Sequence, residues 1–264
     1  SFASRRSDEF VFREFSYHLI GAWLVHIPEL QFIAVIFIKM SPRIESDDLA
    51  VLLILIRQRP AQRIGLKSPE RTEALAVCCA AHGVRFVDAP ISGSSEQIRR
   101  RQGVVLVGGD QAAYDSCLDL IRAVADRHYY LGGPGAGSRA KLASNLVLGL
   151  NRLVLAEGLV FAEQLGLDLP AFLAMLKTTP AYSCAMDVKG EKMLRGDFTP
   201  QSKVAQHHKD LRIILDCAAK VGQELPLAAL HKEILEQAMA AGEGDLDTSV
   251  VLQVLRRMRR PESA

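Results

Sequence analysis

The sequence predicts a mixed α/β domain followed by an all-helical domain. Before residue 135, short apolar runs of strand length recur along the chain, several of them bounded by Gly, Pro, Asp or Ser. After that point, apolar residues recur at helical spacing to the end of the chain, and no further strand pattern occurs. Hydrophobic residues make up 49% of the 264 residues, which is enough for a substantial core.

Three segments with strand character lie in the second half of the α/β part. They are "VRFVDAPI" (Val84–Ile91), "GVVLVGG" (Gly103–Gly109) and the short "HYYL" (His128–Leu131). The loop "SGSSEQ" leaves the first of these strands. Asp110 follows the second and is expected to cap a helix that ends near Ala125, because aspartate accepts hydrogen bonds from the first helical amides.

The helical part begins with one long helix, expected from Ala140 to about Leu165. It is apolar on two faces, which indicates a buried helix rather than one lying on the surface. Proline, aspartate and glycine mark the boundaries of the later helices. We expect these to begin at Asp168 and stop before Pro180, then to cover roughly Ser183–Leu194, Lys203–Gly222 and Pro226–Ala241, with Asp247 capping the last.

The first 64 residues contain a single glycine, Gly21, and few turn signals. The apolar runs Phe32–Ile38 and Leu49–Ile56 each have fewer than ten residues. A membrane helix needs about 20 residues, so these runs predict buried strands rather than membrane spans. No secretory signal pattern is present, and we expect no membrane partner.

Charge and cysteine content exclude few functions but favour a reducing compartment. The net charge is +2, and the arginine runs at 99–101 and 256–260 are interpreted as a solvated loop and a helix end, so no nucleic-acid partner is predicted. None of the five cysteines has zinc-site spacing, and they are interpreted as free thiols of a cytoplasmic protein. The adjacent His207 and His208 are expected on a polar helix surface, so no metal site is predicted.

The stretch "LGGPGAGSRAKLASN" (Leu131–Asn145) has the glycine content of a phosphate-binding loop but fails both common templates. Gly132 and Gly137 have P-loop spacing, but Ser-Arg follows where the motif requires Lys and Ser or Thr. Gly135, Gly137 and Ala140 match G-x-G-x-x-G/A, but they precede an all-helical region instead of opening a βαβ unit. The glycines are therefore expected to shape the turn before a helix.

Lys141 and Asn145 follow this turn and are four residues apart, so they share one helix face. The helix dipole and partial burial both disfavour a charged ammonium near a helix start. A lysine in such a place can exchange a proton with a substrate oxygen, and the asparagine can orient the same substrate. From spacing alone, the alternative is a surface lysine beside a capping amide.

Five motifs occur in this order along the chain: "FVDAPISG", "GVVLVGGD", "GPGAGSRAKLASN", "GDFTPQSKVAQHHKDL" and "GEGDLDTS". Together they resemble the β-hydroxyacid dehydrogenase family, which includes 3-hydroxyisobutyrate dehydrogenase, tartronate semialdehyde reductase and 6-phosphogluconate dehydrogenase. The resemblance implies a Rossmann-type nucleotide-binding domain at 1–134, atypical over 1–64, and a helical substrate and dimerisation domain at 135–264. It implies hydride transfer between NAD or NADP and a small β-hydroxyacid or its semialdehyde, in a homodimer or homotetramer.

The resemblance also implies roles for particular residues. Lys141 takes the position of the catalytic acid/base, and Asn145 that of a substrate-binding residue. Ser92 and Gly93 occupy the substrate-binding positions of the D-x-P-x-S-G loop. For the cofactor, the resemblance implies Lys209 in the K-D-L motif and Ser68 in a remnant of the family's S-T-x-S-P segment.

The chain departs from the family at its N-terminus. The family begins with a strand and G-x-G-x-x-G, and residues 1–64 contain no such glycine fingerprint, so the nucleotide-binding domain is expected to be degenerate or truncated. The alternative function is therefore a non-catalytic relative that has lost cofactor binding and acts as a dimerising interaction protein. Retention of Lys141, Asn145, Ser92 and Lys209 favours the enzyme.

Overall fold

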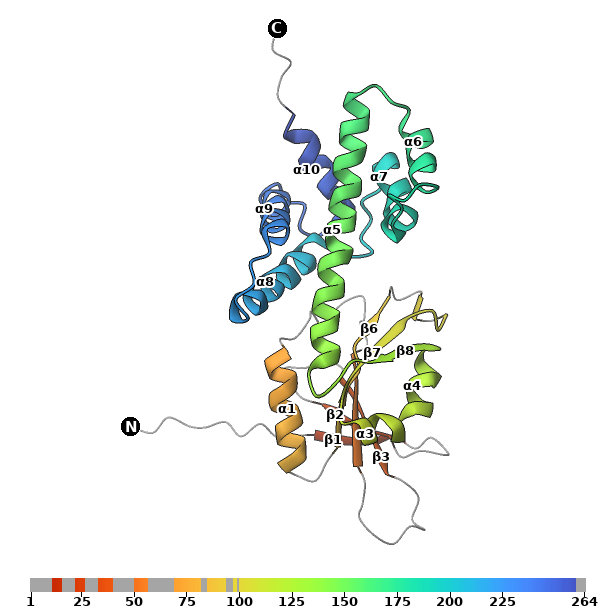
Figure 1. Ribbon diagram of the computed structural model, residues 1–264, viewed down its shortest axis with the longest axis vertical. Coiled ribbons are helices and arrows are strands. Elements are labelled where there is room, and N and C mark those ends of the chain that lie inside the picture. Colours follow the sequence, from red (N-terminus) through yellow and green to blue (C-terminus); the bar gives the residue numbers. More distant parts are fainter. Residues whose placement is uncertain are drawn as a thin grey trace, which may run out of the picture. The chain divides into compact units, whose positions relative to one another are not determined.

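The structure, a computed structural model, divides into two compact units, Ser1–Lys141 and Leu142–Ala264 (Figure 1). It describes the backbone of four strands at 11–15, 22–26, 33–39 and 50–56, and complete residues at 69–81, 85–93, 97–98 and 100–259. One 29-residue helix, α5 (Ala136–Gln164), begins in the first unit and continues through the second.

The first unit contains a mixed six-stranded sheet. Two of its strand pairs, β4 with β5 and β7 with β8, are parallel, and its other pairs are antiparallel. The two early apolar runs form strands as predicted, and the burial expected for them lies outside the described residues. The strands lie in the order β3 (Ile33–Lys39), β4 (Ala50–Ile56), β5 (Arg85–Asp88), β7 (Val104–Gly109) and β6 (Ile91–Ser92), with β8 (Arg127–Tyr130) paired to β7.

Two further strands, β1 (Val11–Phe15) and β2 (Ala22–His26), pair antiparallel in a separate small sheet. The sequence gives little local indication of this pair, because turn residues are scarce around it. The mixed sheet with its helices, followed by a helical unit, confirms the predicted fold class.

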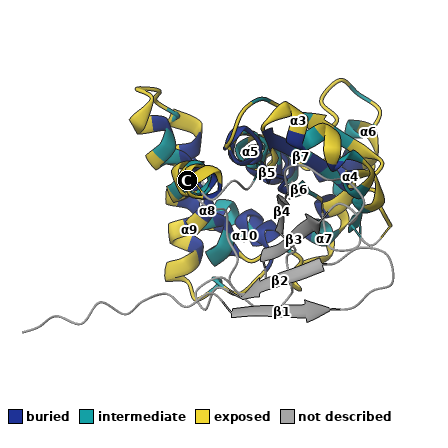
Figure 2. Cartoon of the chain, turned by 90° about the horizontal axis from the view of Figure 1, so that it is seen from below, coloured by how far each residue is buried: buried dark blue, intermediate teal, exposed yellow. Residues whose placement is uncertain are grey.

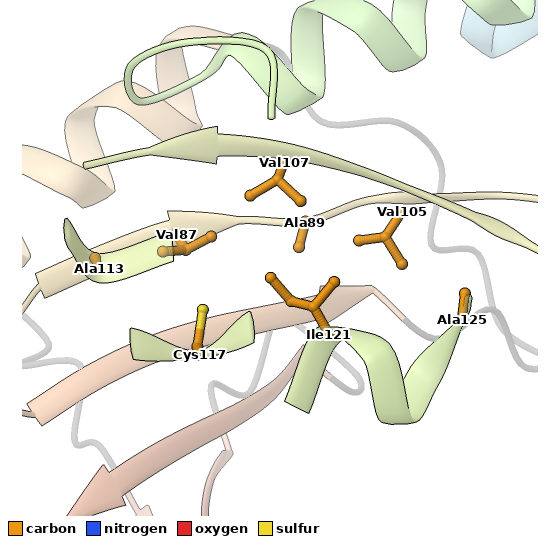
Figure 3. Close-up of a cluster of buried hydrophobic side chains, with 8 residues drawn as sticks. All are labelled: Val87, Ala89, Val105, Val107, Ala113, Cys117, Ile121 and Ala125. Carbon is orange, nitrogen blue, oxygen red and sulfur yellow. The ribbon is translucent and has the colours of Figure 1, made fainter. Parts of the chain in front are cut away.

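The core of the first unit lies between the sheet and two short helices, α3 (Gln111–Ser116) and α4 (Leu118–Val124) (Figure 3). Alternate residues of β7 enter it, as the two-residue period of a strand requires. Its members are all at most 1% exposed, and they are Val87, Ala89, Val105, Val107, Ala113, Cys117, Ile121 and Ala125.

The helix predicted after Asp110 is two helices that meet at Cys117. Asp110 caps the first by accepting a hydrogen bond from Ala113 N over 2.9 Å, as predicted. Cys117 has φ −109° and ψ 12°, outside helical values, and its side chain is 1% exposed in the core. The helix is therefore interrupted where Cys117 is buried in the core. The helical period of the sequence does not reveal this interruption.

The second unit is entirely helical apart from one isolated bridge between Lys203 and Asp247, within the residues described. The aspartates predicted to cap its helices do so, since Asp168 accepts from Ala171 N and Asp247 accepts from Ser249 N. Besides α5, its helices are α6 (Leu169–Leu176), η1 (Met186–Gly190), α7 (Glu191–Arg195), α8 (Val204–Lys220), α9 (Pro226–Ala240), η2 (Thr248–Val250) and α10 (Val251–Arg257).

The helix predicted over Ser183–Leu194 contains the π-helical turn η1, after which it continues as α7. Gly190 lies at the join, where an added Cβ would come within 2.7 Å of the Leu173 side chain. The glycine therefore permits α6 to pack closely on this segment. Gly196, with φ +66°, then ends α7 in the left-handed conformation that favours glycine.

Both buried and outward-facing apolar residues lie along α5 and its neighbours. Figure 2 shows buried and exposed residues side by side on α9, as expected of an amphipathic helix. Within the described part of the chain, α5 alone has the length and hydropathy of a membrane-crossing helix, and only 39% of its most apolar window is buried. Among the described residues, the large apolar side chains of Val147, Val154 and Phe161 on α5 are exposed.

A buried polar network joins α5 to α8 and corrects one prediction. His207 is 4% exposed, so its expected place on a polar helix surface is wrong. Its ring Nε2 lies 3.2 Å from Arg152 Nη2, and Arg152 Nη1 donates to Thr248 Oγ1 over 2.8 Å. Gly149 makes this approach possible, because an added Cβ would lie 2.4 Å from His207 Nε2. His207 is thus part of helix packing.

Candidate active site

The N-terminus of α5 is held by the carboxylate of Asp88, the last residue of β5. Gly135 N donates to Asp88 Oδ1 over 3.1 Å, and Ser138 N donates to Asp88 Oδ2 over 2.8 Å. The Asp88 side chain is deeply buried, with 3% of the residue exposed. Amides at a helix start lack partners within the helix, and the helix dipole favours an anion there. A single side chain from the sheet therefore accepts hydrogen bonds from two amides at the start of α5.

Glycines surround this carboxylate because nothing larger fits. A Cβ on Gly108 would lie 2.4 Å from Asp88 Oδ1, and a Cβ on Gly137 would lie 2.5 Å from the carbonyl oxygen of Leu106. Gly135 adopts φ +81°, a conformation that other residues rarely take. The glycine-rich stretch thus shapes the turn before α5 and packs it on β7, and two of its amides donate to an internal carboxylate.

The buried carboxyl of Asp88 accepts hydrogen bonds that oppose the cost of its burial. Burial raises the pKa of the Asp88 carboxyl above its ordinary value, and hydrogen bonds from Ser138 and Gly135 oppose that rise.

The helix α1 (Pro69–Ala81) adds two further contacts to the turn at the start of α5. Thr72 Oγ1 lies 3.1 Å from Ser138 Oγ, and Glu73 forms an ion pair with Arg139. The start of α5 is therefore fixed from both β5 and α1.

Lys141 lies three residues after Ser138 on α5 and is 8% exposed. Lysine is rarely buried to this degree, so its place on the helix is not that of an ordinary surface residue. Asn145 follows one helical turn later and is half-buried. Residues 138, 141 and 145 share one stripe of the helix by its 3.6-residue period. The helix therefore brings the predicted acid/base and the predicted substrate-binding amide together.

Ser92 and Gly93 lie just beyond β5, in and after the short strand β6. Ser92 is half-buried, and Gly93 is exposed with φ +146°. An added Cβ on Gly93 would also lie 3.3 Å from the Cα of Gly103. The glycine is therefore required for the turn. It leaves a hydroxyl and a backbone amide at the end of a strand, where α/β sheets bind ligands.

The structure says less about Lys209 and Ser68, the two residues predicted to bind the cofactor, than about the predicted substrate-binding residues. Lys209 is exposed on α8, two residues beyond the buried His207 and so on a different face of that helix. Ser68 lies outside the described residues. Across the described part of the chain, no group of three or more His, Cys, Asp or Glu residues is placed to hold a metal ion.

Asp88 is the residue that sequence reasoning did not single out. It belongs to the quoted motif "FVDAPISG", and a carboxylate at a strand end is the signal that marks it. Its partners are 47 and 50 residues away in the chain, so no local pattern connects them.

Two family profiles match consecutive parts of the chain. The profile described as "NAD binding domain of 6-phosphogluconate dehydrogenase" matches residues 63–132. The profile described as "NAD-binding of NADP-dependent 3-hydroxyisobutyrate dehydrogenase" matches residues 135–255. The two matches meet within the glycine-rich stretch that precedes α5.

Relatives with assigned activities match a similar share of the chain. A 2-(hydroxymethyl)glutarate dehydrogenase of Eubacterium barkeri is 31% identical over 192 residues, which are 72% of this chain and 64% of the relative. A 2-hydroxy-3-oxopropionate reductase of Escherichia coli K12 is 32% identical over 193 residues, which are 72% of this chain and 65% of the relative. The chain thus spans a little less than two thirds of the length of these relatives.

Solved structures agree with the sequence relatives. The 3-hydroxyisobutyrate dehydrogenase of Salmonella typhimurium is 28% identical and has a TM-score of 0.66, over 71% of this chain and 66% of that one. The corresponding enzyme of Mycobacterium tuberculosis, solved with L-serine, is 27% identical with a TM-score of 0.65, over 72% of this chain and 67% of that one.

Proposed function

We propose that this chain, which belongs to the β-hydroxyacid dehydrogenase family, transfers a hydride between NAD or NADP and a small β-hydroxyacid or its semialdehyde. The substrates named for its relatives are short hydroxyacids with a carboxylate near the reacting carbon. The same class of substrate is proposed here.

The proton step is assigned to Lys141. In the reducing direction, hydride arrives at the carbonyl carbon, and the Lys141 ammonium donates a proton to the oxygen as the alcohol forms. In the oxidising direction, the neutral amine removes the hydroxyl proton as hydride leaves the carbon. The nicotinamide supplies or accepts the hydride when bound, while the protein orients the substrate and moves the proton.

Substrate orientation is assigned to the groups near the start of α5 and after β6. Asn145 is one turn from Lys141, so its amide is suited to hold the oxygen that Lys141 protonates. The Ser92 hydroxyl and Gly93 amide are suited to bind the substrate carboxylate. Lys209 and Ser68 are assigned to cofactor binding from the family resemblance.

The described residues fit the substrate end of this reaction better than the phosphate end of a dinucleotide. The amides of Gly135 and Ser138 already donate to Asp88, so this glycine-rich helix start does not supply a phosphate cradle. We therefore assign no phosphate contact to it.

The observation that carries the proposal is the burial of Lys141, at 8% exposed, one turn before Asn145 on a helix fixed at its start. A relative that only dimerises does not require Lys141 and Asn145 on one stripe of this helix. For assembly and location, we propose a cytoplasmic homodimer or homotetramer without a nucleic-acid or membrane partner. All five cysteines are free thiols, which suits a reducing compartment.

The proposal is tested by an assay of the purified chain with NAD and NADP. 3-Hydroxyisobutyrate and 2-(hydroxymethyl)glutarate are offered with the oxidised nucleotides, the semialdehyde 2-hydroxy-3-oxopropionate is offered with the reduced nucleotides, and nicotinamide absorbance is followed. Isobutyrate, which lacks the hydroxyl, is the matched control. We expect turnover of at least one β-hydroxyacid or semialdehyde and none of isobutyrate. Binding of the nucleotides without turnover of any of these substrates would contradict the proposal.

A further inference from the structure

The buried carboxylate of Asp88 has no role in the proton step, yet it connects the sheet to the helix that carries Lys141. We propose that Asp88 is a positioning residue for the reaction, one that fixes the height and rotation of α5 and thereby the place of Lys141. This inference rests on the proposed function, in which Lys141 exchanges the proton.

The geometry fixes two degrees of freedom at once. Each oxygen of Asp88 accepts from a different amide, Oδ1 from Gly135 and Oδ2 from Ser138. Two amides three residues apart around the helix axis hold its rotation as well as its height. Ser138 and Lys141 are also three residues apart, so a shift at Ser138 is transmitted to Lys141 within one turn.

A carboxylate is needed at this position, because an amide offers a single acceptor. Asparagine would satisfy one of the two helix amides and would turn its own N–H groups toward the other. It would also remove the negative charge that the helix dipole favours. The fit around the carboxylate leaves no other group space, since a Cβ on Gly108 would lie 2.4 Å from Oδ1 and one on Gly137 would lie 2.9 Å from Oδ2.

A comparison with Asp110 separates positioning from ordinary capping. Asp110 caps α3 through Ala113 N, three residues along the chain, so it stabilises a helix locally without connecting it to another element. Asp88 reaches amides 47 and 50 residues away and joins the end of a strand to a helix. Loss of either cap costs stability, but only loss of Asp88 releases the start of α5 from the sheet.

The test is a double-mutant cycle on the whole chain, with Asp88→Asn, Lys141→Ala and the double variant, and Asp110→Asn as the matched control. Measurements are made below the melting temperature of every variant, as checked by circular dichroism. We expect Asp88→Asn to lower kcat by about tenfold to a hundredfold, the order expected for a misplaced catalytic group. The nucleotide Kd and the KM of the hydroxyacid should change less than about threefold, and Asp110→Asn should leave kcat near its parent value.

The decisive comparison is the effect of Asp88→Asn when Lys141 is absent. If Asp88 acts through Lys141, the substitution has little further effect on kcat in the Lys141→Ala background. An equal loss in both backgrounds overturns the positioning role while leaving the proposed function in place. A Lys141→Ala variant with parent kcat overturns the proposed function and this inference together.

A second measurement does not depend on activity. Hydrogen exchange of the amides at 135–141 should be faster in Asp88→Asn than in the parent and unchanged in Asp110→Asn, because only the first substitution releases this turn. Unchanged exchange at 135–141 in Asp88→Asn would overturn the inference directly.

Discussion

Two glycines of the same helix differ in how closely other atoms pack against them. Gly137 and Gly158 both lie in α5. A Cβ on Gly137 would come within 2.5 Å of a backbone oxygen, whereas a Cβ on Gly158 would meet nothing within 4 Å. The same substitution should therefore have opposite effects at the two sites.

We predict that Gly137→Ala destabilises the protein by about 1–3 kcal/mol, because backbone atoms must move to admit the methyl group. Gly158→Ala should be neutral or stabilising by up to about 1 kcal/mol, since alanine favours a helix more than glycine does. Urea unfolding of both variants measures this difference. Equal destabilisation at both positions would show that the packing at Gly137 is not tight.

Two buried histidines should make stability depend on pH. Burial lowers the pKa of His231 to about 4, and burial beside Arg152 lowers the pKa of His207 well below its ordinary value. The folded state therefore resists protonation that the unfolded state accepts below about pH 6.5.

For these histidines, stability should be fully present above about pH 6.5 and lost as the pH falls toward 4. The slope is at most about 1.4 kcal/mol per pH unit for each group. Urea unfolding between pH 7 and pH 5 measures the slope, and His231→Gln should reduce it. A slope that is the same in His231→Gln and the parent would exclude His231 as the cause.

Among the helices of the second unit, one buried ion pair joins three segments. Lys189 in η1 contacts both oxygens of Asp247 at 2.8 Å, and Asp247 also accepts from the amides of Gln201 and Ser249. Asp247 is 0% exposed. Two residues earlier, Asp245 pairs with Lys203 at the surface over 2.8 Å.

We predict that Asp247→Ala destabilises the protein by about 3–5 kcal/mol, because it leaves Lys189 buried without its carboxylate. Asp245→Ala should cost less than about 1 kcal/mol, as is usual for exposed ion pairs. Thermal unfolding of the two variants compares them directly. Similar melting temperatures for both would mean that the buried pair contributes no more than the exposed one.

The sequence predicts features that depend on neighbouring residues, but not those that depend on contacts between residues far apart in the chain. The strand at 104–109 and the caps at Asp110 and Asp168 depend on local pattern, and the structure confirms them. The single strand predicted over Val84–Ile91 is instead two strands, Arg85–Asp88 and Ile91–Ser92. The predicted start of α5 was Ala140, but the helix begins at Ala136. Asp88, far away in the chain, accepts from the amides of Gly135, just before this turn, and Ser138, within it, and no local pattern reveals these contacts.

The same reasoning applies to the candidate site. The spacing of Lys141 and Asn145 predicts their common face, because a helix has a fixed period. Burial of Lys141 and His207 depends on which helices pack together, which no local pattern reveals. The break at Cys117 is also set by the core of the first unit, since a helical period continues across it.

For the chain as a whole, the uncovered apolar face of α5 favours association. Val147, Val154 and Phe161 are 58%, 66% and 64% exposed, and their seven-residue spacing places them in one stripe. We predict a dimer or larger assembly through this stripe, because exposed apolar surface usually marks an interface.

Light scattering after size exclusion at micromolar concentration measures the mass. The parent should be at least a dimer, and Val154→Asp should lower the mass toward the monomer. Val221→Asp is the matched control, since Val221 is 79% exposed at the C-cap of α8, outside the stripe on α5. A monomeric parent, or equal loss of mass in both variants, would exclude the stripe as the interface.

The decisive experiment for the proposed chemistry compares three proteins: the parent, Lys141→Ala and Lys141→Arg. Turnover of a β-hydroxyacid and nucleotide affinity are measured for each. We predict that Lys141→Ala lowers kcat by about 10²–10⁴-fold with nucleotide affinity nearly unchanged, as for loss of a general acid/base. Lys141→Arg should restore little, because a guanidinium keeps its proton near neutral pH. Nearly full turnover in Lys141→Ala, with loss of nucleotide affinity, would contradict the assignment and place the cofactor at this helix start.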